Sequence, residues 1–276
     1  MSVWYSIFMG LVQGIAEFLP ISSSGHLAIM EHFFGVNMEI PEVFDVLLHL
    51  GTLLAVFAAY WSDICAMVRE FFIGCKDLAK HTTPKPLPSA RRLILLIIVA
   101  TIPLFAVLPI KDHIQGLGNN LYFVGGALLV TGVLLWLCDR VKKGKKNADT
   151  ATFKDAVIVG VCQAIATCPG ISRSGTTITS GCFCGFERSF AVRFSFLLSI
   201  PAVLGANILS LLDVIRGGVD MSQLPIYCIG VAVAAISGFA SLRLLRFIAS
   251  RGKFGAFAYY CWAVGALTIV LKFFGF

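Results

Sequence analysis

The chain has 276 residues, of which 58% are hydrophobic and only 13% charged, and its mean hydropathy is +0.86. A soluble domain of this length cannot bury so much apolar surface, and the long continuous apolar stretches exclude a β-barrel, so we expect an all-α integral membrane protein. We interpret the net charge of +7 as a topology signal with affinity for anionic membrane lipids, and expect no nucleic-acid partner.

In chain order, an apolar segment with unusual polar residues, 3–34, precedes the first full span at 44–61. Five more stretches are long enough to cross a bilayer as helices: 93–110, 121–138, 190–212, 225–242 and 256–274. A second polar-containing segment, 153–186, lies between the third and fourth spans. The nine cysteines lack zinc-like pairing, and we interpret them as packing residues.

The loops between these spans differ sharply in their content of Lys and Arg. The counts are six in 62–92, one in 111–120, six in 139–154, one in 213–224 and four in 243–255. Loops rich in Lys and Arg face the cytoplasm, so the poor loops face outward. No Lys or Arg precedes Arg69, which predicts that the region up to Asp45, including Glu31, Glu39 and Glu42, lies on the outer side.

The segment 10–25, GLVQGIAEFLPISSSG, recurs 150 positions later as GVCQAIATCPGISRSG at 160–175. Eight of the sixteen aligned positions are identical, where this composition gives roughly one or two by chance. The chain is therefore a duplicated unit, with repeat 1 at about 1–142 and repeat 2 at about 151–276. The two halves form a single membrane domain over 1–276.

Each half consists of a motif segment followed by three spans. The charge pattern puts the first motif outside and the second inside, so each motif segment must return to the side from which it came. We therefore expect two re-entrant helix pairs, 3–19 with 22–34 and 153–167 with 172–186, that enter from opposite faces. Together with six full spans, this is the inverted-repeat plan of many membrane proteins.

Proline breaks both motif segments, at Pro20 and at Pro169–Gly170. Ser22 and Ser172 follow the breaks, where a hydroxyl can cap the next helix. Each break thus places a helix N-terminus inside the membrane, which is an anion site if the two breaks face each other. The second copy adds Arg173, which is costly in hydrocarbon and matches a phosphate partner; its neighbours Ser172, Ser174, Thr176 and Thr177 are polar.

The first copy supplies the complementary chemistry. Gln13 and Glu17 lie one helical turn apart, so they share a face that can hold a divalent cation or handle a proton. Ser23 and His26, three residues apart, share a face on the next helix. A hydroxyl beside an imidazole, with a carboxylate behind it, is the arrangement for phosphoryl or acyl transfer by an activated nucleophile.

Two long motifs carry a resemblance to a known family. Residues 13–26, QGIAEFLPISSSGH, and residues 169–177, PGISRSGTT, resemble the signature regions of the bacterial undecaprenyl-diphosphate phosphatases of the bacitracin-resistance type. The stretch 44–51, FDVLLHLG, resembles the family as well, so the match covers essentially the whole chain. The family often has two glutamates in the first motif, whereas this chain has Gln13 and a single carboxylate, Glu17. His49 stands where glutamine is expected.

The resemblance implies that the chain hydrolyses undecaprenyl diphosphate to undecaprenyl phosphate and inorganic phosphate, which recycles the lipid carrier of cell-wall synthesis. It implies a divalent cation, Mg²⁺ or Ca²⁺, and an active site on the outer side of the bacterial cytoplasmic membrane. By position, the family's active-site places fall on Glu17, Ser23, His26, Ser172, Arg173 and Thr177. We expect Glu17, Ser23, His26 and Arg173 to be catalytic, Ser172, Arg173, Ser174 and Thr177 to bind phosphate, and Glu17 with Gln13 to hold the metal.

Several alternatives stay open. Ser23 is the preferred nucleophile, activated by His26, but His26 itself is the other candidate. Glu17 and Arg173 can also form a structural salt bridge, and the other serines of the motifs fit capping and packing roles. A lipid-carrier flippase or transporter would use the same midplane anion site, whereas the other membrane lipid-phosphatase superfamily lacks its downstream histidine and aspartate here. A homodimer is a further open possibility.

Overall fold

The computed structural model describes residues 1–33, 42–82, 84–217, 221–251 and 253–275. Glu39 of the predicted outer region lies outside these described residues. The regular secondary structure of the described residues is helical, with one isolated bridge between Lys146 and Phe186. The helices are α1 Val3–Phe18, α2 Ser23–Phe33, α3 Glu42–Ala59, α4 Trp61–Ala79, α5 Ser89–Thr101, η1 Ile102–Ile110, α6 Lys111–Gly116, η2 Leu117–Asn119, α7 Leu121–Arg140, α8 Phe153–Ile165, α9 Arg173–Phe183, α10 Arg188–Gly217, η3 Met221–Gln223, α11 Leu224–Arg251 and α12 Gly255–Phe273.

The chain is a multi-pass membrane protein. Five helical segments among the described residues are long and apolar enough to cross a membrane: Ser89–Asn119, Leu121–Arg140, Arg188–Ile208, Leu224–Arg251 and Gly255–Phe273. They contain or overlap five of the six expected spans, so these five are confirmed as helices of sufficient length and apolarity. The expected span 93–110 runs through α5 into the 3₁₀ segment η1, where Pro103 and Pro109 remove the amide donors that an α-helix needs.

The expected first span, 44–61, is corrected by the structure. Helix α3 ends at Ala59, and α4 leaves from Trp61 at 83°, so only the bent pair α3 and α4 together meets the length and apolarity of a span. Tyr60 adopts a non-helical backbone (φ −118°, ψ 24°), and its buried ring lies 6.3 Å from that of Phe196. No proline or glycine lies next to Tyr60 to reveal this bend, since Gly51 and Gly74 are both more than two helical turns away.

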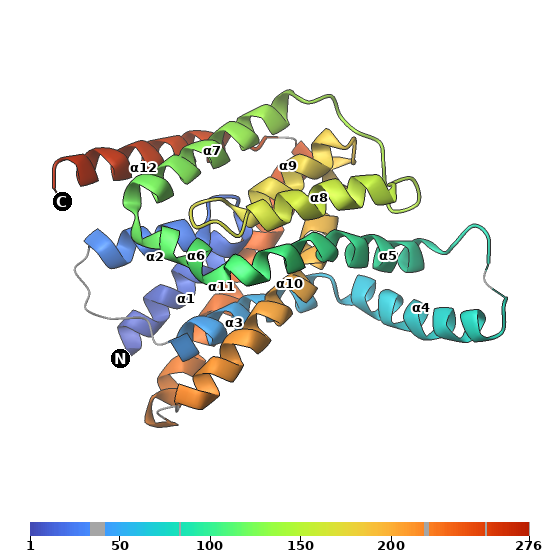
Figure 1. Ribbon diagram of the computed structural model, residues 1–276, viewed down its shortest axis with the longest axis horizontal. Helices are drawn as coiled ribbons and strands as arrows, with labels where there is room; N and C mark the ends of the chain where they lie inside the picture. The colour runs from blue at the N-terminus through green and yellow to red at the C-terminus, as the bar shows by residue number, and fades with distance from the viewer. Residues whose placement is uncertain (34–41, 83, 218–220, 252, 276) are drawn as a thin grey trace.

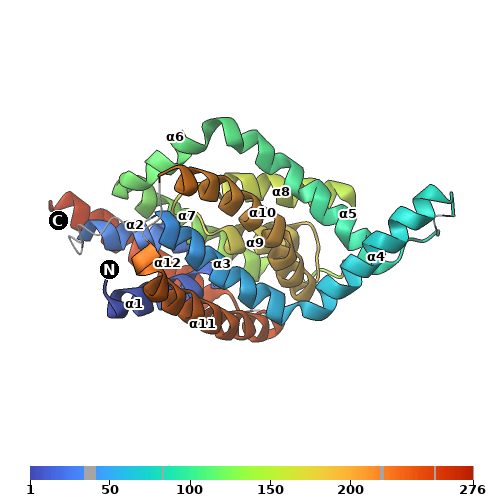
Figure 2. The same cartoon turned by 90° about the horizontal axis from the view of Figure 1, so that it is seen from below.

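The helices pack in pairs that join the two halves of the chain. Helix α12 lies along α7, as Figure 1 shows, and α1 packs on α11. Helix α3 contacts both α10 and α11, while α8 packs on α5 and η1. Helix α4 contacts chiefly α5, has no buried residues, and extends to one side of the bundle (Figure 2). All nine cysteines are free; Cys138, Cys182 and Cys261 are buried, as expected of packing residues, whereas Cys65, Cys75 and Cys228 are exposed.

Candidate active site

Two breaks interrupt the motif segments, after α1 at residues 19–22 and after α8 at residues 166–172, and they lie against each other. A Cβ atom added to Gly25 would lie 3.0 Å from the Cα atom of Gly170, and one added to Gly175 would lie 3.2 Å from the Cβ atom of Pro20. Each break therefore packs against the first turn of the other motif's second helix. This contact brings the starts of α2 and α9 together.

A serine caps each of these helix starts, as expected from the sequence. The Ser22 hydroxyl accepts a hydrogen bond from the Gly25 amide at 3.2 Å, and the Ser172 hydroxyl accepts one from the Gly175 amide at 3.1 Å. The remaining amides of the first turn, which include that of Ser174 on α9, have no partner within their helix. Both helices thus direct free N–H groups and the positive ends of their dipoles toward the junction.

Glu17, near the end of α1, is the centre of the polar network at the junction. Its Oε1 atom accepts a hydrogen bond from the Arg173 guanidinium. Its Oε2 atom accepts from the Ser23 hydroxyl at 2.9 Å and from Gln13 Nε2 at 3.2 Å, and His49 Nε2 lies 4.0 Å from Oε2. The structure thus brings together four of the expected site residues, Gln13, Glu17, Ser23 and Arg173, from both halves of the chain.

The ion pair of Glu17 and Arg173 is shielded from solvent. The Glu17 side chain is 9% exposed and that of Arg173 is 21% exposed. Removing a carboxylate from water costs several kcal/mol, which the arginine and two hydrogen-bond donors offset. The site therefore stabilises an ionised carboxylate within hydrogen-bond distance of a serine hydroxyl, which is the geometry of a base beside a nucleophile.

The structure gives His26 different partners from the one that the sequence suggested. Its Nδ1 atom lies 2.8 Å from the Ser22 carbonyl, and its Nε2 atom lies 2.8 Å from the hydroxyl of Tyr260 on α12, whose ring stacks on the imidazole. Because a carbonyl only accepts, Nδ1 carries a proton, and in the neutral imidazole Nε2 accepts from Tyr260. The Ser23 hydroxyl faces Glu17, so the expected contact of hydroxyl and imidazole is absent from the described hydrogen bonds.

The expected phosphate-binding residues divide into two groups. Ser172, Arg173 and Ser174 line a cavity of about 60 Å³ at the junction, together with Glu17 and residues 22–24. Thr177 lies behind this cavity, where its hydroxyl donates to the Arg173 carbonyl at 2.9 Å and lies 2.6 Å from the hydroxyl of Ser195 on α10.

Two contacts of the site were not deduced from the sequence. His49 was noted as unusual, and the structure places it beside Glu17, with Nδ1 3.0 Å from the Asp45 carbonyl. Tyr260 had no sequence signal, because tyrosines such as Tyr259 and Tyr260 in an apolar span are typical of packing or of an interfacial position.

The residues of the junction fit a cation that is bound mainly through phosphate oxygens. Among the described residues, no group of three or more His, Cys, Asp or Glu side chains could hold a metal on its own. However, Gln13 Oε1 is buried without a hydrogen-bond partner, and it lies on the same side chain that donates to Glu17. One carboxylate oxygen and one amide oxygen suit Mg²⁺ or Ca²⁺ when a substrate supplies the remaining ligands.

The fold and the junction define a class of protein: a multi-pass helical membrane protein whose buried carboxylate, arginine and serine meet where two broken helical segments touch. The family model described as "Bacitracin resistance protein BacA" matches residues 6–267. The chain belongs to this family.

Curated relatives match over nearly the full length. A protein of Alkaliphilus metalliredigens named "Undecaprenyl-diphosphatase" is 41% identical over 273 residues, which cover 99% of each chain. A protein of the same name from Methanosphaera stadtmanae is 40% identical over 97% of each chain. "Undecaprenyl-diphosphatase 4" of Bacillus cereus is 37% identical over 98% of each chain.

Proposed function

We propose that the chain hydrolyses undecaprenyl diphosphate to undecaprenyl phosphate and inorganic phosphate. Full-length similarity to the proteins named undecaprenyl-diphosphatase supports this function. The observation that carries it within this chain is the hydrogen bond of 2.9 Å between the Ser23 hydroxyl and Glu17, beside Arg173. The reaction recycles the lipid carrier of cell-wall synthesis.

The reaction proceeds in two steps through Ser23. Glu17 accepts the Ser23 proton as the serine oxygen attacks the terminal phosphorus, and the bond from this phosphorus to the bridging oxygen breaks. Undecaprenyl phosphate leaves, and water then hydrolyses the phosphoserine. Glu17 returns its proton to the serine oxygen as inorganic phosphate departs. Glu17 therefore takes the role of base that the sequence suggested for His26.

Arg173 and the start of α9 bind the diphosphate. The guanidinium has five N–H donors, and its bond to Glu17 uses only part of them. It can contact phosphate oxygens while the free amides of the α9 first turn contact others. Ser172 and Ser174 lie beside them, whereas Thr177 supports the backbone of Arg173 from behind.

His26 is the second proton carrier of the proposal. Its hydrogen bond with Tyr260 places an exchangeable proton on the first turn of α2, the helix that carries Ser23. In this proposal His26 protonates the leaving group only after it takes up a proton at Nε2, which displaces the hydrogen bond from Tyr260. It does not act as the nucleophile, because a carbonyl and a tyrosine hydroxyl occupy its two ring nitrogens.

Glu17 and Gln13 would hold a divalent cation, Mg²⁺ or Ca²⁺, together with the substrate's phosphate oxygens. Such a cation, when bound, supplies neutralisation of the charge that develops on the transferred phosphoryl group. The buried unpaired Oε1 atom of Gln13 supports this assignment.

We further propose that the two halves form an inverted repeat with re-entrant motif segments. Pairs of contacts related by the duplication support it. Gly25 lies against Gly170, and Gly175 lies against Pro20. The 150-residue offset aligns Gly25 with Gly175 and Pro20 with Gly170, so the two contacts are equivalent. In the same way α1 packs on α11 while α8 packs on α5, which follows if a two-fold axis relates the halves.

The active site in this proposal opens to the outer side, because the loops rich in Lys and Arg mark the cytoplasmic side. The substrate is then reached from the leaflet that faces away from the cytoplasm. Pairing of two chains as a homodimer also stays a prediction.

Phosphate release from a defined lipid tests the function. Purified full-length protein with undecaprenyl diphosphate and Mg²⁺ should release one phosphate per lipid and leave undecaprenyl phosphate, which should itself be a poor substrate. A chelator should lower the rate, and Mg²⁺ or Ca²⁺ should restore it. Lipid movement across reconstituted vesicles without any phosphate release would instead favour the flippase.

A further inference from the structure

A second and larger cavity lies apart from the junction of the two breaks. Its volume is about 640 Å³, within the range of small-molecule sites, and it shares no lining residue with the active-site cavity. Its walls come from five chain segments, 60–63, 89, 147–149, 187–193 and 246–249. Four of these segments lie at or next to the three loops rich in Lys and Arg, and the fifth, 187–193, follows Phe186, which forms a backbone bridge to Lys146 of one such loop. The cavity is therefore on the side that the loop charges assign to the cytoplasm.

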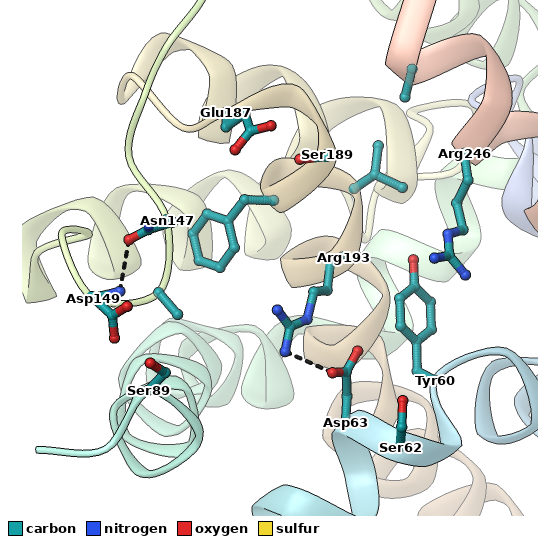
Figure 3. A pocket seen from close by; sticks show the side chains of 14 residues that line it. Tyr60, Ser62, Asp63, Ser89, Asn147, Asp149, Glu187, Ser189, Arg193 and Arg246 are labelled. Carbon is teal, nitrogen blue, oxygen red and sulfur yellow. Dashed lines mark hydrogen bonds and ion pairs between the residues drawn. The ribbon is translucent and has the colours of Figure 1, made fainter.

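Hydrogen-bond donors without acceptors gather at one end of this cavity. Tyr60 is 3% exposed, and its hydroxyl is buried without a hydrogen-bond partner. Arg193 gives one nitrogen to Asp63 at 2.7 Å, but its Nε atom is also buried and unpaired. Arg246 lies over the Tyr60 ring, 5.2 Å from its centroid. Figure 3 shows the Tyr60 hydroxyl directed toward the Arg246 guanidinium.

The charges at this end leave one cation uncompensated. Asp63 neutralises Arg193, whereas no carboxylate of the described ranges lies within ion-pair distance of Arg246. The other two carboxylates of the lining, Asp149 and Glu187, lie across the cavity from Tyr60 and Arg246 in Figure 3. An arginine carries donors only, so its missing partner is a group rich in acceptors.

We propose that the end of the cavity formed by Tyr60, Arg193 and Arg246 binds a phosphate oxyanion. A tetrahedral phosphate has enough acceptor oxygens for the Tyr60 hydroxyl, the free Nε of Arg193 and a paired contact from Arg246. The carboxylates at the opposite end disfavour a second negative charge there. The ligand is therefore a single phosphate, either free inorganic phosphate or the phosphate of a lipid headgroup at the membrane surface.

Binding of inorganic phosphate to the full-length protein tests this site. All measurements use an Arg173→Ala background, so that the proposed active site contributes little. Isothermal titration should detect phosphate binding in this background. Arg246→Gln should weaken it by at least about tenfold, because a charge-assisted pair of hydrogen bonds is lost. Tyr60→Phe, which removes only the unpaired hydroxyl, should weaken it by roughly three- to tenfold.

Arg243→Gln is the matched control. Arg243 lies on the same helix and also over an aromatic ring, 4.5 Å from the centroid of Phe239, but it does not line the cavity. Its replacement should leave phosphate binding unchanged. Because these titrations measure binding alone, they give the same answer whether or not the protein proves to be a phosphatase.

A second arm identifies the source of the phosphate. Native mass spectrometry with added phosphatidylglycerol should show a retained lipid that Arg246→Gln loses and Arg243→Gln keeps, if the headgroup is the natural ligand. Loss of binding in Arg246→Gln alone, in either arm, supports the site. Equal binding by the Arg246→Gln and Arg243→Gln proteins in both arms would overturn the proposal.

Discussion

Glu17 receives hydrogen bonds from both halves of the chain. Arg173 comes from the second repeat, while Ser23 and Gln13 come from the first. This arrangement fixes the carboxylate on one side of the serine hydroxyl and leaves the serine oxygen free to approach a phosphorus atom. The same three donors satisfy the carboxylate oxygens in a site that is largely closed to water.

The substitution Ser23→Ala tests whether Ser23 is the nucleophile. The substitution removes one hydroxyl and leaves the pair of Glu17 and Arg173 intact, so the protein should remain folded. We expect the rate of phosphate release to fall at least about a thousandfold, as for other enzymes that lose a covalent nucleophile. Ser24→Ala is the control, because the Ser24 hydroxyl contacts only Ser22, at 3.4 Å, among the described hydrogen bonds. Similar rates in the two variants would remove Ser23 from this role.

The sequence predicted the meeting of the charged residues of the site but did not predict the contact of His26 with Tyr260. The duplicated motif predicted that Glu17 and Arg173 would meet, because each sits beside a helix break that has few stable environments in a membrane. The orientation of His26 was not predictable. It depends on Tyr260, which is 234 residues away in an apolar stretch that gives no sign of a polar contact.

The breaks between helices determine where the site forms. Thr131 of α7 holds the second break from two directions, because its hydroxyl donates to the Gly170 carbonyl at 3.3 Å and accepts from the Ser172 amide at 3.1 Å. Gly170 itself has φ +91°, a conformation that residues with a side chain rarely adopt. The second break is therefore a fixed turn, not a hinge.

Gly170→Ala tests the importance of this turn. The added Cβ would meet the Val124 carbonyl and the Ala127 side chain at 2.7 Å, in addition to the backbone strain. We expect a loss of roughly 1–3 kcal/mol in the free energy of unfolding, measured by thermal or denaturant unfolding in detergent. Gly126→Ala on α7, where no atom lies within 4 Å of the new Cβ, should be neutral or slightly stabilising. Equal stability of the two variants would contradict the account of the break.

The sequence predicted the ends of helices where a proline marks them, because proline restricts the backbone. Proline and a following serine predicted both breaks to within a few residues. The bend at Tyr60 has no such marker, since neither proline nor glycine stands beside it and only the polar pair Ser62–Asp63 follows. The apolar stretch up to Trp61 therefore predicted a span that continues past the point where α3 ends.

The arrangement of the whole molecule follows from the duplication. Helix pairs such as α7 with α12 and α3 with α10 join corresponding parts of the two halves. Because α7 is a single span, the loops at 111–120 and 139–154 on either side of it should lie on opposite sides of the membrane, as their content of Lys and Arg predicts.

Labelling of single cysteines tests this orientation. Cysteines are introduced at the exposed positions Asn119 and Lys143, in a background without the exposed Cys65, Cys75 and Cys228. In intact cells, a membrane-impermeant maleimide should react with the cysteine at 119 and not with the one at 143 until the membrane is opened. Equal labelling of both positions, or the reverse pattern, would contradict the proposed topology.

The most direct test of the central claim is the rate of phosphate release from undecaprenyl diphosphate by the Arg173→Ala and Arg173→Lys proteins. Arg173→Lys keeps a positive charge beside Glu17 and so protects the fold, but loses the planar pair of donors. If the two halves assemble one active site, Arg173→Ala should lower the rate by roughly a hundred- to a thousandfold, with a smaller but clear loss for Arg173→Lys. Rates equal to the wild type in both folded variants would show that the junction of the two breaks is not where the diphosphate is cleaved.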